Sequence, residues 1–388
     1  MSREIPPFTG GGGIGSYVAS AGPGLVAAGH QVHVLSCAPG QASSDVDVDG
    51  MAVHRRPVGV IHGLRRIAGK PGGLRLEAAA SVYRELDRLG TFDVAEVPDW
   101  LGEGLLVSWR GAVPTVSQLH TPHRLTQEYL GRSWDRADRV ADWVERSAVR
   151  RSTLTVSPSK LIVEELRTRG WLDDREVEII RYAVDWQRWG AVDPVERTEP
   201  VVAVLGRVEP RKGQAELVEA VARAAVPGAR LLLLGQVADP AYAEAVRSRA
   251  AQLGVDVTWA GQVPRAELPE RLGGVRVVAV PSTFESFSMV TLEAMAAARP
   301  VVLSTAVGAG ELLTGTSAGC VVPLTDIDGW AGVLSTYLTD PAEAASAGEH
   351  GKRLVREHCD PLTVAAKRVR AYERAIALHD ERRHRRAR

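Results

Sequence analysis

Cysteine, net charge and long apolar runs are all scarce in this chain of 388 residues. The three cysteines, Cys37, Cys320 and Cys359, are far apart and form no Cys-x-x-Cys pair, which argues against a disulfide framework and a zinc site. The 47 lysines and arginines balance the 47 aspartates and glutamates, so no electrostatic argument favours a nucleic-acid partner. No apolar run approaches the roughly 18 residues of a membrane span, and "MSREIPPFT" lacks the apolar core of a signal peptide. These absences favour a cytoplasmic protein.

Short β-branched runs alternate with helical patterns along the whole chain. They are "QVHVLS", "FDVAEV", "PTVSQL", "TLTVS" and "VEII" in the first half, and "VVAVLG", "RLLLLG", "VDVTWAG", "RVVAVP" and "PVVLS" in the second. Apolar strands between helices indicate parallel sheets covered on both faces. Because the chain exceeds the usual size of one core, we predict an α/β protein with two doubly wound, Rossmann-like domains and a linker near residues 186–199. Ligands are then expected in a cleft at the carboxyl ends of the strands.

The glycine run "GGGGIGSYV" places Gly10, Gly12 and Gly15 in Gly-x-Gly-x-x-Gly spacing ahead of a helix predicted over Ile14–Ala28. Glycine allows backbone amides to approach a phosphate, and a helix start favours negative charge. A dinucleotide site also needs an acidic residue about twenty positions on, where this chain has Ser36 and Cys37. The run therefore indicates a phosphate or acceptor contact rather than nicotinamide or flavin binding.

A doubly wound domain needs an interior strand before its glycine loop, and "MSREIPPFT" is a poor candidate. Pro6 and Pro7 remove backbone donors, and the segment has no run of four apolar residues. We therefore expect the N-terminal first strand to be missing, and the natural protein to begin upstream of Met1.

One acidic cluster resembles a metal site but fails the requirements of one. The stretch "DVDVDG", Asp45 to Gly50, imitates the first half of a calcium loop, yet Arg56 stands at the twelfth position where a glutamate is required. We interpret it as a turn before a short strand at "MAVHRRP". No metal site is predicted.

The second half carries two cations and two carboxylates at places where a nucleotide could bind. Arg207 follows a predicted strand and Lys212 precedes a helix, a placement that suits a diphosphate. Glu293 is expected in the first turn of the helix "TLEAMAAA", where it could accept hydrogen bonds from a ribose diol, and Glu285 lies in the loop before it. Two solvated loop cations remain the alternative on this segment alone.

"GRVEPRKG", "VPSTFESFSMVTLEAMAAARPVV", "GAGELL" and "AGCVVPLTD" resemble the donor-binding half of the retaining nucleotide-sugar glycosyltransferases of family four. "GGGGIGSYV", "AAGHQVHVLS", "VPDWLGEG" and "SQLHTPH" resemble the acceptor half, so the resemblance covers nearly the whole chain. It implies the GT-B fold, with an acceptor-binding domain over residues 1–188 and a nucleotide-sugar-binding domain over 189–362. Residues 363–388 would form a helix that returns to the first domain, followed by a basic tail.

The resemblance also implies roles for particular residues. Arg207 and Lys212 would bind the diphosphate, Glu293 the ribose and Glu285 the donor sugar. His120 would face the reacting sugar, and Gly12 and Gly13 would approach the phosphate or the acceptor. Backbone amides near the donor would come from the four residues after Glu285, which are Ser286, Phe287, Ser288 and Met289. The family's usual Asn-Gly-Val-Asp linker is replaced by "RYAVD", with Arg181 and Tyr182 in place of Asn-Gly, and "FESFSM" replaces a glycine-containing sequence.

The implied reaction moves a hexose-type sugar from a nucleotide-diphosphate sugar to an acceptor hydroxyl, with retention and without a metal or other cofactor. The acceptor could be a small cyclitol or aminosugar, a polysaccharide or a lipid. Arg65, Arg66, Lys70 and Arg75 could touch an anionic membrane, but a solvated loop and helix start is the favoured interpretation. The alternative function is a non-catalytic subunit that binds a sugar nucleotide and acts through a partner.

Overall fold

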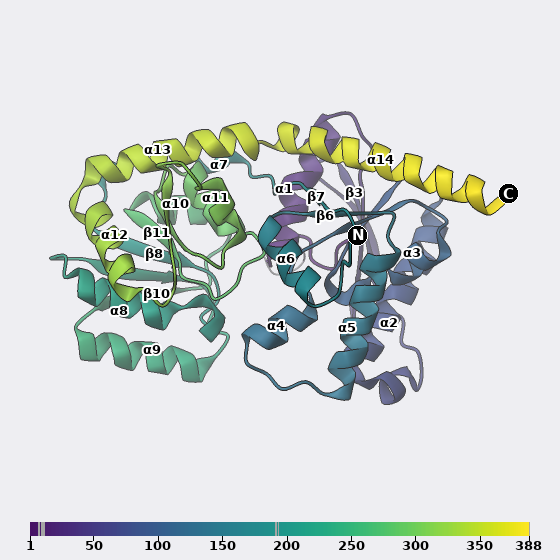
Figure 1. Cartoon of the computed structure of the whole chain (residues 1–388), viewed down its shortest axis with the longest axis horizontal. Coiled ribbons are helices and arrows are strands. Elements are labelled where there is room, and N and C mark those ends of the chain that lie inside the picture. The colour runs from purple at the N-terminus through teal and green to yellow at the C-terminus, as the bar shows by residue number, and fades with distance from the viewer. Residues whose placement is uncertain (7, 9–11, 191, 193, 388) are drawn as a thin grey trace. The chain divides into compact units, whose positions relative to one another are not determined.

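The chain forms two compact units in a computed structural model that describes residues 1–387 except 7, 9–11, 191 and 193 (Figure 1). Unit 1 comprises Met1–Ala183 and Pro361–Arg388, and unit 2 comprises Val184–Asp360. The units divide after Ala183 and after Asp360; the functional domain boundaries after residues 188 and 362 and the linker near residues 186–199 stay predictions. No helix in the described part of the chain is both long and apolar enough to cross a membrane.

Unit 1 contains two small sheets whose strands alternate with helices. One sheet has the order β1-β3-β2, in which β1 (His33–Ala38) pairs in parallel with β3 (Met51–Pro57) and β2 (Ser44–Val48) is antiparallel. The other is wholly parallel, with the order β4-β5-β6-β7. Its strands are β4 (Ala95–Pro98), β5 (Thr115–Gln118), β6 (Leu154–Ser157) and β7 (Glu178–Ile179). The helices of unit 1 are α1 (Gly13–Ala27), α2 (Leu64–Leu89), α3 (Leu105–Arg110), α4 (His123–Tyr129), α5 (Arg136–Arg151), α6 (Lys160–Thr168) and α14 (Pro361–Ala387), with the 3-10 turn η1 (Trp100–Gly102).

The segment before α1 bonds to both sheets, although no strand is assigned to its described residues. The Ser2 amide donates to the Leu35 carbonyl on β1 at 3.0 Å, and the Met1 amino group donates to the Glu96 carbonyl on β4 at 2.6 Å. Ile5 is buried in the core beside β1 and β3. No regular strand is formed by the described residues before α1, as we expected, but Leu35 and Glu96 have backbone partners there.

Unit 2 is a doubly wound domain with the strand order β10-β9-β8-β11-β12-β13, all parallel. The strands are β8 (Val201–Leu205), β9 (Arg230–Leu234), β10 (Asp256–Gly261), β11 (Val277–Val280), β12 (Val301–Ser304) and β13 (Gly319–Val322). The helices are α7 (Trp186–Trp189), α8 (Gln214–Ala224), α9 (Pro240–Leu253), α10 (Leu268–Gly273), α11 (Met289–Ala296), α12 (Ile327–Thr339) and α13 (Pro341–His358), with the 3-10 turns η2 (Val195–Arg197), η3 (Pro210–Lys212) and η4 (Gly308–Leu312). Because the order of strands reverses between β8 and β11, this point of the sheet is where such folds bind ligands.

All eleven strands predicted from the sequence are present, the ten apolar runs and the short strand at "MAVHRRP", and two further strands, β2 and β13, were not predicted. Residues 45–48, "DVDV", do not form a turn but make up most of β2, because Val46 and Val48 pack into the core beside β1 and β3. The turn follows at Asp49 and Gly50, both with positive φ. The residues of strand β13 appeared in the sequence analysis only within the family motif "AGCVVPLTD", and no strand was predicted there. Among the described residues no group of acidic, histidine or cysteine side chains could hold a metal ion, and none of the three cysteines forms a disulfide.

Candidate functional site

The predicted cations and carboxylates meet at the point where the strand order of unit 2 reverses. Arg207 follows β8, and Glu285 follows β11, the neighbour of β8 in the sheet. Because both strands are parallel, their carboxyl ends lie at one edge, and the loops that leave them share it. This edge therefore assembles the candidate site from residues far apart in the sequence.

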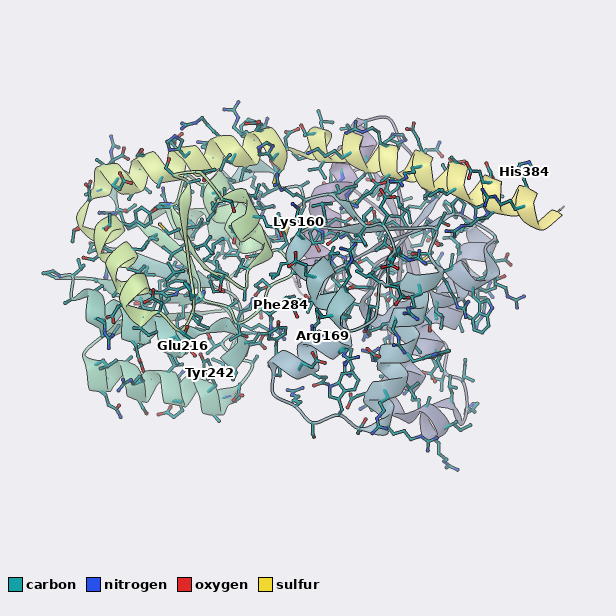
Figure 2. The ribbon with its side chains drawn as sticks, viewed as in Figure 1. Lys160, Arg169, Glu216, Tyr242, Phe284 and His384 are labelled. Carbon is teal, nitrogen blue, oxygen red and sulfur yellow. The ribbon has the colours of Figure 1, made fainter. Side chains whose placement is uncertain are left out.

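The loop between β8 and α8 approaches the loop after β11 so closely that glycine is required at its end. Gly213 has φ +65°, and a Cβ on it would lie 1.9 Å from the Pro281 carbonyl oxygen. Helix α8 begins at the next residue, and the Ala215 amide in its first turn donates to the Tyr242 hydroxyl on α9 at 3.0 Å. Figure 2 shows Tyr242 on α9 below Glu216 on α8. These contacts fix the start of α8, and with it Lys212.

Glu285 is the centre of a cluster of hydrogen-bonded charges. Its Oε1 accepts hydrogen bonds from Lys212 Nζ, from Arg211 Nη1 at 3.3 Å and from Ser282 Oγ at 3.2 Å. Arg211 also donates to the carbonyl of Phe284, which Figure 2 labels, at 2.8 Å. Burial opposes ionisation of Glu285, but Lys212 and Arg211 outweigh it and lower its pKa to about 2. Glu285 is therefore a fixed carboxylate at neutral pH.

Arg207 is placed differently from the other two cations. Its side chain is 52% exposed, and its Nη2 bonds only to Glu209, at 3.1 Å, among the described residues. Glu209 Oε1 also accepts from Arg211 Nη2 at 3.1 Å. One exposed cation and two largely buried ones thus line the same loop, and Arg207 retains donors for a ligand.

Glu293 lies deeper than Glu285 and has a different partner. It is 3% exposed, and its Oε1 forms an ion pair with Arg265 at 2.7 Å. Burial raises its pKa, although Arg265 and Arg188 favour the carboxylate. Glu293 is not in the first helical turn as we expected: α11 begins at Met289, two residues earlier than the predicted helix, because Ser288 Oγ accepts the Thr291 amide and caps it there. The helix dipole therefore has little to do with the position of Glu293.

The segment between the two glutamates is held by backbone hydrogen bonds. The Glu285 amide donates to Ala306 O at 2.9 Å, the Gly308 amide to Glu285 O at 3.0 Å, and the Ala309 amide to Phe287 O at 2.9 Å. The Phe287 side chain is fully buried. Ser288 has φ +98°, a conformation that is strained for a residue with a side chain. The loop over Ser286, Phe287, Ser288 and Met289 is therefore anchored by backbone hydrogen bonds and by the buried Phe287, and its contribution of amides to a donor stays a prediction.

His120, the remaining predicted catalytic residue, belongs to unit 1 and follows β5. It is 5% exposed; its amide donates to Asp99 Oδ2 at 3.0 Å, and its Nδ1 lies 2.6 Å from the Tyr182 hydroxyl. Burial lowers the pKa of His120 to about 3 and raises that of Asp99 to about 8. The imidazole is therefore neutral at physiological pH. His123, the second histidine of "QLHTPH", pairs instead with Asp138 at 2.6 Å.

The glycine run meets a carboxylate rather than open space. Gly12 is the N-cap of α1, and a Cβ on it would lie 2.1 Å from Glu4 Oε2. The same oxygen accepts the Gly15 amide at 3.2 Å, whereas Gly13 has nothing near its Cβ position. Gly10 lies outside the described residues. In this structure the anion at the start of α1 is thus the side chain of Glu4.

Both halves of the chain match known family models. Residues 11–188 match "Glycosyltransferase Family 4", and residues 188–354 match "Glycosyl transferases group 1". The two family matches and the two α/β units define the class of protein, a glycosyltransferase with the GT-B fold. The chain belongs to the glycosyltransferases of family four.

Curated relatives and solved structures agree with this assignment. The chain is 29% identical to the α-maltose-1-phosphate synthase of Mycolicibacterium smegmatis, over 97% of this chain and 99% of the relative. It is 28% identical to a D-inositol 3-phosphate glycosyltransferase of Jonesia denitrificans, over 89% of this chain and 88% of the relative. Sucrose-phosphate synthase from Thermosynechococcus elongatus has a similar fold, with a TM-score of 0.78 at 22% identity and 94% coverage of both chains.

Four residues of the site were not predicted from the sequence. Arg211 and Ser282 contact Glu285, Glu209 joins Arg207 to Arg211, and Arg265 pairs with Glu293. The adjacent basic residues in "PRKG" were a signal for Arg211, but the other three contacts depend on loop geometry.

Proposed function

We propose that the protein is a retaining hexosyltransferase that uses a nucleotide-diphosphate sugar. The observation that carries this proposal is the cluster of Arg211, Lys212 and Glu285 beside the exposed Arg207, at the strand reversal of a doubly wound domain. A diphosphate is an anion that a guanidinium and an ammonium group can bind together, and the adjacent carboxylate can accept hydrogen bonds from sugar hydroxyls.

In the proposed complex, Arg207 and Lys212 bind the diphosphate, Glu293 accepts hydrogen bonds from the ribose and Glu285 from the transferred sugar. Glu285 has a second task, since its charge holds Lys212 in the loop before the donor arrives. His120 faces the reacting sugar from the acceptor domain. Gly12 and Gly13 approach the donor or the acceptor, which requires Glu4 to leave the start of α1.

The proposed chemistry is a same-face displacement. The bond from the anomeric carbon to the leaving phosphate oxygen breaks, the acceptor oxygen bonds to that carbon on the same face, and the acceptor proton passes to the leaving diphosphate. Negative charge grows on the phosphate as the bond breaks, so fixed cations stabilise the transition state more than the ground state. Arg207 and Lys212 supply this stabilisation, and we infer that the reaction needs no metal ion.

The acceptor is the least constrained part of the proposal. A small cyclitol or aminosugar, a polysaccharide and a lipid all provide the required hydroxyl. The names of the two curated relatives refer to a sugar phosphate and to a cyclitol phosphate, which favours a small polar acceptor. A cytoplasmic location, where such soluble substrates would be met, belongs to the same proposal.

A thermal-shift panel of ADP-, GDP- and UDP-sugars, followed by product analysis with the stabilising donor, tests this function. We expect one donor to raise the melting temperature and to be hydrolysed slowly even without an acceptor. Binding without any turnover, alone or with candidate acceptors, would instead favour the non-catalytic subunit. Lys212→Met is the matched variant, because it should lose both the shift and the hydrolysis.

A further inference from the structure

Glu293 has a positive charge close to one of its oxygens but no hydrogen-bond donor there. Its Oε1 is buried, and Arg265 Nη2 lies 2.7 Å away. No group in the described part of the chain donates a hydrogen bond to Oε1, so the guanidinium supplies charge at short range without occupying this acceptor. A buried carboxylate oxygen without a donor is costly, and a hydroxyl group of a ligand would remove that cost. Glu293 Oε1 is therefore an acceptor that a bound molecule can use.

Arg265 reaches Glu293 from a short loop at the edge of the sheet that carries the candidate site. The loop joins β10 to α10, and the Glu267 amide donates to the Pro264 carbonyl at 2.9 Å, which closes a turn around Arg265. Because the sheet is parallel throughout, the loop after β10 and helix α11 after β11 start from the same edge. The Arg265 side chain is 27% exposed and that of Glu293 is 4% exposed, so of the two charges it is the guanidinium that meets solvent.

Two cations oppose the effect of burial on Glu293. Burial raises the pKa of this carboxyl group, while Arg265 on the loop and, more weakly, Arg188 on α7 favour the carboxylate. Among the described residues no other titratable group acts on its ionisation, including those of α13, β11 and β12, which pack against α11. Helix α13 meets α11 at Gly351, whose Cβ position lies 3.2 Å from Met295, and β11 and β12 contain no titratable residue. The charge of Glu293 thus depends mainly on Arg265.

We propose that Arg265 is a positioning residue that keeps Glu293 in the carboxylate form and leaves its Oε1 to accept a hydrogen bond from a ribose hydroxyl group. This inference rests on the proposed function, because it takes the ribose diol of the nucleotide to be the ligand of Glu293. A carboxylate accepts hydrogen bonds at both oxygens, whereas a protonated carboxyl group turns one of them into a donor. Without Arg265, burial favours the protonated form, and the diol loses an acceptor.

The experiment compares Arg265→Met and Arg265→Lys with the wild type. Methionine removes the charge and keeps a side chain of similar length, and lysine restores the charge. The probes are ADP, GDP and UDP, and calorimetry follows the one that binds the wild type most tightly between about pH 6 and about pH 9. The ratio of the dissociation constants of variant and wild type at each pH cancels the titration of the diphosphate itself. Arg249→Gln is the control, because the ion pair of Arg249 with Glu219 is exposed on both sides.

We expect Arg265→Met to bind the nucleotide as the wild type does near pH 9 and progressively more weakly as the pH falls. The ratio of dissociation constants should rise by up to about tenfold per pH unit, because one proton on Glu293 then opposes binding. Arg265→Lys and Arg249→Gln should follow the wild type. The 2′,3′-dideoxy analogue of the same nucleotide lacks the diol, so its affinity should be the same for Arg265→Met and the wild type.

Two results of the titration would overturn the proposal. Tighter binding by Arg265→Met at every pH would show that Arg265 competes with the ribose for Glu293. An equal loss of affinity at every pH would show that Arg265 contacts the nucleotide or only maintains the loop.

The ionisation of Glu293 is measured separately in the ligand-free protein. Carboxyl carbon-13 spectra, with Glu293 assigned by difference from Glu293→Gln, give the pH at which this group titrates. We expect that pH to be higher in Arg265→Met than in the wild type, and the same pH in both proteins would overturn the proposal. If none of the three nucleotides binds the wild type, the proposed function fails, while the spectra still show whether Arg265 controls the charge of Glu293.

Discussion

Replacing Glu285 by glutamine should destabilise the empty protein, lower turnover and leave nucleotide binding intact. The Glu285 side chain is 17% exposed, and its partners Lys212 and Arg211 are 15% and 12% exposed. The fall of its pKa from 4.5 to about 2 corresponds to about 3 kcal/mol in favour of the carboxylate. Glutamine keeps the size of the side chain but removes the charge that offsets two nearly buried cations.

We therefore expect the free energy of unfolding of ligand-free Glu285→Gln to fall by about 2 to 3 kcal/mol in urea titrations. A bound nucleoside diphosphate brings negative charge to the same cations, so it should stabilise the variant about as much as it stabilises the wild type. Turnover should fall by about a hundredfold or more, because a contact to the reacting sugar is lost. Glu219→Gln is the control, since its pair with Arg249 is exposed on both sides.

The nucleotide affinity of Glu285→Gln, measured by calorimetry, shows whether Glu285 contacts the transferred sugar, as we propose, or only helps to bind the nucleotide. Glu293→Ala removes the proposed ribose contact and should weaken nucleotide binding. An equal loss of nucleotide affinity in the two variants would refute the division of labour between the glutamates. The pH dependence gives a second check: the contribution of Glu285 to stability is present above pH 4.5 and should disappear as the pH falls through 2.

Four further outcomes are expected. Alanine at Arg207 or Lys212 should lower kcat by about a hundredfold or more, whereas alanine at the surface residue Arg223 should not; unchanged rates at both sites would remove them from the mechanism. Transfer should persist in excess chelator, and a loss that manganese restores would contradict the role given to the cations. Because burial lowers the pKa of His120 from 6.5 to about 3, the free energy of unfolding should decrease as the pH drops below 6.5. His120→Gln should reduce this dependence on pH by up to about 1.4 kcal/mol per pH unit. An identical pH dependence of the two proteins in urea titrations would show that the histidine is not buried in neutral form. Ser288→Gly should be more stable than Ser288→Ala by about 1 to 2 kcal/mol, since only glycine relieves the positive φ while both lose the cap; equal stability in urea would indicate a relaxed backbone.

The sequence predicted the fold well because apolar strands and helices leave strong local patterns. Strands β8 and β11 are continuous valine-rich runs, and their position in the centre of the sheet follows from that burial. Strand β2 was missed because aspartate is frequent in turns, although the alternation of aspartate with Val46 and Val48 is the pattern of a half-buried strand, here paired antiparallel with β3. The doubly wound order of unit 2 then determines where a ligand can bind.

The candidate site was predictable in its residues but not in its pairings. Lys212 and Glu285 were each identified, yet their mutual bond depends on the close approach of two loops at Gly213. Arg265 could not be assigned to Glu293, because nothing in a loop sequence fixes the direction of a long side chain. Tyr182 stood out only as a departure from the family pattern, and its contact with His120 is evident only in the folded structure.

The return of α14 to unit 1 has a consequence for synthesis on the ribosome. The sequence of unit 2 lies between the two segments of unit 1, so the sheet of unit 2 can be complete before residues 361–388 have been synthesised. Unit 1 is completed only when α14 has been synthesised. The carboxylate of Glu96 on β4 accepts hydrogen bonds from Arg368 Nη1 and from the Tyr372 hydroxyl, both at 2.7 Å and both on α14. Until α14 emerges, Glu96 lacks these two donors. We therefore expect unit 2 to fold first in the nascent chain, and unit 1 to reach its final stability only after α14 leaves the exit tunnel.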